Sequence, residues 1–188
     1  MRVLTWATEG ATPGASAIAL RRPDPGDRQG LDAMVGRCSL ASRYGRFLGP
    51  LRRFPAGYLD AVTAPHPDVE AFVGVPRPGD TRTVLALGSL HLQDTECAEV
   101  ALLVEDAWQR RGVGTRLLVG LAEQARLRDV TVLQATVLSE HTHVLRLLNS
   151  VFGPSQMVQE MGTTVVTVRL HGGRPQAAAV ANTITLER

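Results

Sequence analysis

The chain has 188 residues, enough for one domain with a full hydrophobic core, and 44% of its residues are hydrophobic. A formal net charge of only +2 gives no reason to expect binding to nucleic acid or to a membrane surface, and no stretch reaches the roughly 18–20 apolar residues of a membrane span. The two cysteines, Cys38 and Cys97, lack metal-type spacing, which predicts no bound metal and a reducing cytoplasm.

The first expected elements alternate with turns. A strand over residues 16–21 leads into a turn rich in proline, glycine and aspartate. Asp27, at the end of that turn, is expected to cap a helix that reaches about Arg37. Two further short helical segments are expected over residues 41–47 and 58–62.

Three strands joined by short turns follow, over residues 69–75, 83–92 and 96–104. Their connections are too short for crossovers, so the strands are predicted to form an antiparallel meander. A helix with regular apolar spacing is then expected over residues 112–128, followed by a strand over 130–138. Because this helix is a crossover, the strands on either side of it are predicted to run parallel within an otherwise antiparallel sheet.

The last expected elements are a helix over residues 141–151 and a strand over 163–170 that closes the sheet. Residues 16–170 are therefore interpreted as one domain, preceded by a flexible arm over 1–15 and followed by a tail over 171–188. The tail could add an edge strand or contact a second copy of the chain in a homodimer.

The turn Gln109-Arg110-Arg111-Gly112-Val113-Gly114-Thr115 joins a strand to the start of a helix. The first N–H groups of a helix lack intrahelical partners and lie at the positive end of its dipole, so they favour an anion. Two glycines let the backbone approach that anion, and the neighbouring arginines and threonine add charge and a hydroxyl donor. The turn lacks the Gly-Lys-Thr/Ser ending of a Walker motif, and it lacks the third glycine of a dinucleotide-binding fingerprint. By itself, the turn indicates a phosphate or pyrophosphate site, with an ordinary strand-to-helix loop as the alternative.

The wider run from Ala101 to Leu118 resembles the acetyl-CoA-binding motif of the GNAT superfamily of N-acetyltransferases, in which a Gln/Arg-x-x-Gly-x-Gly/Ala turn follows a strand. Residues 42–47 also resemble the first helices of bacterial protein-lysine acetyltransferases. The resemblance implies one α/β (α+β) domain, in which about four helices flank a mixed, mostly antiparallel sheet of six to seven strands. A central parallel pair of strands would be splayed for coenzyme A.

The resemblance also implies acetyl-CoA as co-substrate. A bulge near Leu103 would splay the parallel strands, and the pantetheine arm would pair with the backbone there like an added strand. The pyrophosphate would rest on the amides of the turn, and His141 stands where many members carry an asparagine. The implied cofactor-binding residues are Leu102, Leu103, Val104, Arg110, Arg111, Gly112, Val113, Gly114, Thr115 and His141.

Glu99 is the candidate general base. It lies four residues before Leu103, so both side chains are expected on the same face of a strand. A glutamate here matches the Ala-Glu-Val-Ala pattern of the protein-lysine acetyltransferase branch, where it serves as base; the alternative is a solvent-facing or salt-bridged glutamate. Glu96, on the other face, is a weaker candidate. Leu148 stands where many members carry a tyrosine as general acid.

The remaining reactive side chains are interpreted as structural. Cys97 is expected to be a buried thiol, and Ser139 is a candidate cofactor contact with a capping role as the alternative. The histidines other than His141 show no ligand spacing and are assigned structural or surface roles. They are His66, His91, His143 and His171.

These observations predict an N-acetyltransferase that moves the acetyl group of acetyl-CoA to a primary amine, on a protein lysine or on a small molecule. The chain cannot acetylate lysines of its own, since all 20 of its basic residues are arginines. The alternative is a catalytically idle acyl-CoA-binding sensor or regulatory module. The acceptor itself is not readable, because its pocket is expected to be built from the least patterned part of the chain.

Overall fold

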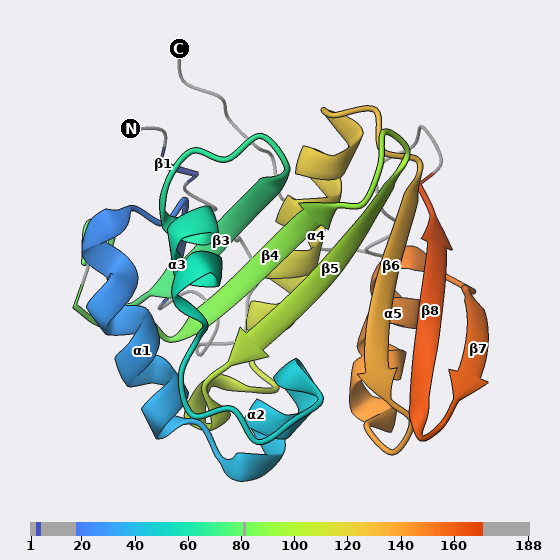
Figure 1. The fold of residues 1–188 in the computed structure, drawn as a ribbon, viewed down its shortest axis with the longest axis horizontal. Coiled ribbons are helices and arrows are strands. Elements are labelled where there is room, and N and C mark those ends of the chain that lie inside the picture. Colours follow the sequence, from blue (N-terminus) through green and yellow to red (C-terminus); the bar gives the residue numbers. More distant parts are fainter. Residues whose placement is uncertain (1–2, 5–17, 81, 171–188) are drawn as a thin grey trace.

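A single mixed sheet organises the computed structural model, which describes residues 3–4, 18–80 and 82–170 (Figure 1). Its strand order is β1-β2-β3-β4-β5-β6-β8-β7, and every neighbouring pair is antiparallel except β5 and β6. The predicted mixed sheet with one central parallel pair is therefore confirmed. The strands are β1 (Val3–Leu4), β2 (Ala19–Arg21), β3 (Val69–Val75), β4 (Ala86–Leu92), β5 (Cys97–Val104), β6 (Val132–Leu138), β7 (Gln156–Glu160) and β8 (Thr163–Arg169).

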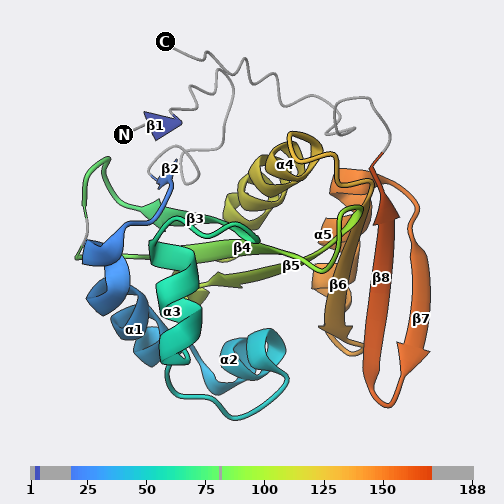
Figure 2. The same ribbon diagram turned by 45° about the horizontal axis from the view of Figure 1, so that its top comes forward.

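Among the described residues, five α-helices cover the two faces of this sheet, three on one side and two on the other (Figure 2). The first group is α1 (Arg28–Arg37), α2 (Leu40–Phe47) and α3 (Ala56–Thr63), and the second is α4 (Val113–Arg126) and α5 (Thr142–Phe152). Each face has its own apolar core. Leu31 and Met34 of α1 belong to the core on the side of α1, α2 and α3. Leu117 and Leu121 of α4 belong to the core on the side of α4 and α5. Strands β3 and β4 are thus buried on both sides, which explains their near-continuous apolar runs, whereas buried residues alternate with more exposed ones in β6 and β8.

The edge strand β7 was not predicted, and β8 consequently does not close the sheet. All five residues of β7 are exposed, so the segment carries no apolar alternation that would mark a strand. Its pairing is set by the two-residue turn Met161-Gly162, in which both residues have positive φ (44° and 86°). Such a turn matches the twist of an antiparallel hairpin and favours glycine, which is the one sequence signal for β7.

Asp27 does not cap α1 with its side chain, contrary to expectation. Its fully buried carboxylate instead accepts two hydrogen bonds from the Arg21 guanidinium, both at 2.6 Å, and one from the N–H of Asp24 at 2.8 Å. The pair ties the end of β2 to the start of α1. Hydrogen bonding to Asp27 raises the pKa of Arg21 against the opposing effect of burial, so the guanidinium stays charged.

Asp27→Ala is expected to lower the free energy of unfolding by about 3–5 kcal/mol, because it leaves a buried guanidinium without its counter-charge. Urea denaturation at neutral pH measures the change. Asp60→Ala is the control: it removes the partner of Arg28 in an ion pair whose side chains are 39% and 67% exposed, and should cost less than about 1 kcal/mol. Equal losses in the two variants would contradict the role assigned to Asp27.

Several sequence predictions fall outside the described ranges. They are most of the expected arm over residues 1–15, the edge strand or homodimer contact in the tail over 171–188, and His171. Within those ranges, no helix combines the length and apolar character needed to cross a membrane.

Candidate active site

The parallel strands β5 and β6 separate part way along their length. They pair only from Cys97↔Val132 to Glu99↔Gln134, although both strands continue beyond that point. Helix α2 lies at the open end, against both strands (Figure 1). The predicted bulge near Leu103 is wrong, because the β4–β5 register runs without interruption from Leu92↔Ala98 to Ala86↔Val104. The strands therefore diverge without an extra residue in β5.

The divergence leaves backbone groups of β5 without a strand opposite them. The carbonyl of Cys97 accepts a hydrogen bond from the N–H of Gln93, just after β4. The carbonyl of Glu96 accepts hydrogen bonds from the N–H groups of Thr131 and Val132, at the start of β6. Peptide groups of a strand point alternately to its two neighbours, so Leu102 and Val104 face the gap, like Glu96. The carbonyl of Val104 is occupied by the side-chain amide of Gln109, at 3.0 Å. The N–H and the C=O of Leu102 remain able to pair with an extended ligand.

The turn before α4 has the backbone expected of an anion site. Arg110 and Gly112 both adopt the left-handed conformation, with φ of 56° and 79°. Gly112 is the N-cap of α4 and has no side-chain cap, and the first hydrogen bond back to it comes from the N–H of Arg116, at 3.1 Å. The amides of residues 113–115 therefore lack intrahelical acceptors at the positive end of a 14-residue helix. An anion fits here because no side chain in the described part of the protein caps these groups.

The same turn is tied to the start of α2. The side-chain amide of Gln109 donates to Ser42 Oγ at 2.9 Å, and Ser42 Oγ donates to Asp106 at 2.9 Å. Asp106 also accepts from both the N–H and the hydroxyl of Ser39, the N-cap of α2. Burial would raise the pKa of Asp106, but these hydrogen bonds outweigh it and hold the pKa below its ordinary value. Sequence reasoning missed this link, although a serine that begins a helix is a recognisable signal.

A cavity of about 680 Å³ connects the gap, the turn and α2. Glu99 lines this cavity, as do most of the residues predicted to bind the cofactor: Leu102, Leu103, Val104, Arg110, Gly112, Gly114, Thr115 and His141. Two predicted residues lie apart from it. The guanidinium of Arg111 lies over the Trp108 ring, 5.1 Å from its centroid. Val113, the first residue of α4, is buried in the hydrophobic core. The backbone amides of both residues still belong to the turn.

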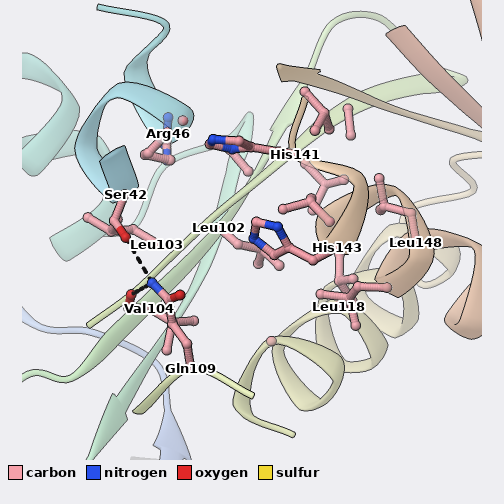
Figure 3. A pocket seen from close by; sticks show the side chains of 18 of the residues that line it. Ser42, Arg46, Leu102, Leu103, Val104, Gln109, Leu118, His141, His143 and Leu148 are labelled. Carbon is pink, nitrogen blue, oxygen red and sulfur yellow. Dashed lines mark hydrogen bonds between the residues drawn. The ribbon is translucent and has the colours of Figure 1, made fainter. Parts of the chain in front are cut away.

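The far wall of the cavity is the start of α5 (Figure 3). His141 and His143 lie there with ring centroids 5.4 Å apart. The His141 ring packs so closely on Gly45 of α2 that a Cβ at Gly45 would come within 2.5 Å of it. Burial, together with the charges of His141, Arg146 and Arg110, lowers the pKa of His143. His143 is exposed, as expected for a surface residue, and it also lines the cavity.

A row of polar side chains lies on the same face of the sheet as Glu99. Arg46 Nη2 donates to the Tyr58 hydroxyl at 2.8 Å, and that hydroxyl donates to Ser89 Oγ at 2.9 Å. Ser89 Oγ is in turn 3.2 Å from His91 Nε2. His91 pairs directly with Glu99 across β4 and β5, so the two side chains project from the same face. Burial and the nearby charge of Arg46 lower the pKa of His91, so its ring is neutral at pH 7.

Of the other residues considered from the sequence, Leu148 lines the cavity, whereas Ser139 and Cys97 do not. Ser139 Oγ is hydrogen-bonded to Thr164 Oγ1 of β8, at 2.8 Å, and a contact between Ser139 and the cofactor stays a prediction. Cys97 is half-buried, and burial raises the pKa of its thiol. Leu148 is buried and lines the cavity, so an apolar side chain stands where the resemblance implies a tyrosine. Among the described residues, no group of histidine, cysteine or acidic side chains has the arrangement of a metal site.

Comparison with known proteins gives a consistent picture. The family model described as the acetyltransferase (GNAT) family matches residues 40–153. No curated protein sequence is significantly similar to the chain.

Among solved structures, the GNAT domain of S. lividans PAT superposes with a TM-score of 0.70 at 24% identity, over 81% of this chain and 90% of that one. YncA from Salmonella typhimurium, solved with its cofactor acetyl-CoA, gives 0.61 at 16% identity, over 84% and 98%. The cAMP-binding acyltransferase from Mycobacterium smegmatis gives 0.59 at 22% identity over 95% of this chain, which spans only 50% of that protein. At these identities, the superpositions establish a shared fold.

Proposed function

The chain belongs to the acetyltransferase (GNAT) family, and we propose that it moves the acetyl group of acetyl-CoA to a primary amine, with Glu99 as general base. The observation that carries the proposal is the cavity in which an uncapped helix start, an open strand edge and a carboxylate meet. The compartment we propose is the cytoplasm, which the two free cysteines support.

Two parts of the chain suit the two polar parts of coenzyme A. The free amides of residues 113–115, with Arg110 beside them, would hold the pyrophosphate. The N–H and C=O of Leu102 would pair with an amide of the pantetheine arm in the gap between β5 and β6. Leu118 and Leu147 provide apolar contact along the way. Binding would then depend chiefly on main-chain atoms and would bring the thioester toward Glu99.

Glu99 would act by accepting the proton of the attacking amine. A lysine-type ammonium has a pKa of about 10.4, so removing its proton at pH 7 costs roughly 4–5 kcal/mol. A positioned carboxylate takes that proton, directly or through a water, as the amine nitrogen bonds to the acetyl carbon. The bond between that carbon and sulfur then breaks. The thiolate can leave without a side-chain acid, since a thiol of pKa about 8.5 is a good leaving group, and Leu148 offers no proton.

The proposal is tested with purified protein, acetyl-CoA and a panel of amines and lysine-containing proteins, with thiol release as readout. We expect amine-dependent release above hydrolysis. A protein lysine is the acceptor we favour, because residues 42–47 resemble the first helices of bacterial protein-lysine acetyltransferases. Since the chain contains no lysine, acetylation of its own side chains does not obscure the assay.

The result that would overturn the proposal is acetyl-CoA binding with no acceptor-dependent release for any amine. That outcome would favour the alternative, a regulatory module that binds the cofactor without turnover. The apolar Leu148 fits this regulatory alternative. The alternative assigns no role, however, to the carboxylate of Glu99 in the cavity.

A further inference from the structure

Arg46 is a cationic residue that lines the cavity. It lies near the end of α2, and its guanidinium is held over the rings of Phe47 and Tyr58, 5.3 Å from each centroid. Its Nη2 donates to the Tyr58 hydroxyl, and its Nε is buried without a hydrogen-bond partner. None of the ion pairs among the described residues includes Arg46. The side chain is thus fixed in position and still able to bind an anion.

The cation and the carboxylate of Glu99 belong to the same cavity. Tyr58, which holds Arg46, stacks on His91 with ring centroids 5.5 Å apart, and His91 is the cross-strand partner of Glu99. Phe54 also stacks on Tyr58, with ring centroids 5.1 Å apart. The aromatic stack behind Arg46 thus reaches the cross-strand partner of Glu99, and an acceptor whose amine reaches Glu99 within the cavity can extend toward Arg46.

We propose that Arg46 binds a carboxylate of the acceptor, so that the preferred acceptor is a primary amine that also carries a carboxylate. This inference rests on the proposed function and adds its substrate class. A planar guanidinium already oriented by Tyr58 loses little entropy when it donates two hydrogen bonds to a carboxylate. A simple alkylamine or a polycationic amine gains no such bonds. The same chemistry is found in a free amino acid and in a lysine beside an acidic residue of a peptide.

Matched acceptors test the proposal. Hexylamine and 6-aminohexanoate present the same amine without and with a carboxylate, and the peptides acetyl-Gly-Lys-Gln-amide and acetyl-Gly-Lys-Glu-amide do so for a protein-like acceptor. We expect kcat/KM to favour the carboxylate-bearing member by about 10- to 100-fold, the size of a charge-assisted hydrogen bond. The pair with the larger preference identifies the source of the carboxylate.

Arg46→Gln should reduce that preference to near unity through the KM for the acceptor, leave the KM for acetyl-CoA unchanged, and keep turnover of hexylamine. Arg46→Lys should restore part of the preference. Arg43→Gln is the matched control, because Arg43 lies on the same helix and lines a separate small pocket beside Leu40. It should leave the preference intact.

Two results would overturn the inference: no preference in the wild-type protein, or an equal loss for both members of each pair in Arg46→Gln. If no amine turns over at all, the proposed function fails, and binding still tests Arg46. In the presence of coenzyme A, 6-aminohexanoate should raise the melting temperature of the wild type and of Glu99→Gln, whereas hexylamine should not. Absence of this difference would overturn the inference independently of catalysis.

Discussion

Glu99→Gln is expected to lower kcat by about 10²- to 10⁴-fold at pH 7, the usual contribution of a positioned general base. Glutamine keeps the size and hydrogen-bonding capacity of the side chain but cannot accept the proton. The amine must then lose it to solvent before attack. The variant should bind acetyl-CoA as tightly as the wild type, because the amides and strand edge that suit the cofactor lie elsewhere in the cavity. Steady-state thiol release and a thermal shift with acetyl-CoA measure the two quantities separately.

The pH profile separates a base from a structural residue. Turnover of Glu99→Gln should rise about tenfold per pH unit toward the pKa of the amine, because hydroxide replaces the missing base. Glu96→Gln is the control, since Glu96 is exposed and its side chain lies outside the cavity. It should keep wild-type kcat. Undiminished turnover in Glu99→Gln at pH 7 would exclude Glu99 as the base, and a loss that alkaline pH does not restore would indicate a structural role.

The sequence was most informative where a segment has a strong local pattern. The apolar spacing of α4 and its position between two strands predicted the crossover, and with it the parallel pair at which the site lies. The anion site in the turn before α4 could also be predicted from the sequence, because a helix start with glycines and no side-chain cap is a local feature. The bulge near Leu103 came only from the resemblance. It is wrong because β5 keeps a one-to-one register with β4 while separating from β6.

The row of polar side chains on the same face of the sheet as Glu99 could not be predicted, because its residues come from separate segments. Arg46 lies on α2, Tyr58 on α3, and Ser89 and His91 on β4. None has a motif, and the cross-strand pairing of His91 with Glu99 depends on a register that side-chain patterns leave open. His91 and His143 were accordingly assigned structural or surface roles. The open strand edge likewise became visible only once the pairing of β5 and β6 was known to stop at Glu99↔Gln134.

Gly112→Val is expected to abolish the stabilisation that acetyl-CoA gives the wild-type protein. At a ligand concentration about 100 times Kd, mass action contributes about 2.7 kcal/mol, or a rise in Tm of about 5–11 °C for a domain of this size. Gly112 has φ of 79°, a conformation that costs a side-chain-bearing residue roughly 1–2 kcal/mol and is least accessible to a β-branched one. The variant would relieve this strain by changing the turn, and the amides at the start of α4 would no longer converge on one anion.

Gly79→Val separates loss of the anion site from general strain. Gly79 has nearly the same φ, 80°, in the turn between β3 and β4, and a Cβ there would meet nothing within 4 Å. Both variants should therefore lose similar stability without ligand, whereas only Gly112→Val should lose the response to acetyl-CoA. A full thermal shift in Gly112→Val would place the pyrophosphate elsewhere in the cavity, and the uncapped start of α4 would then need another ligand. Loss of the shift in both variants would mean that strain alone, without any change at the turn, is enough to prevent binding.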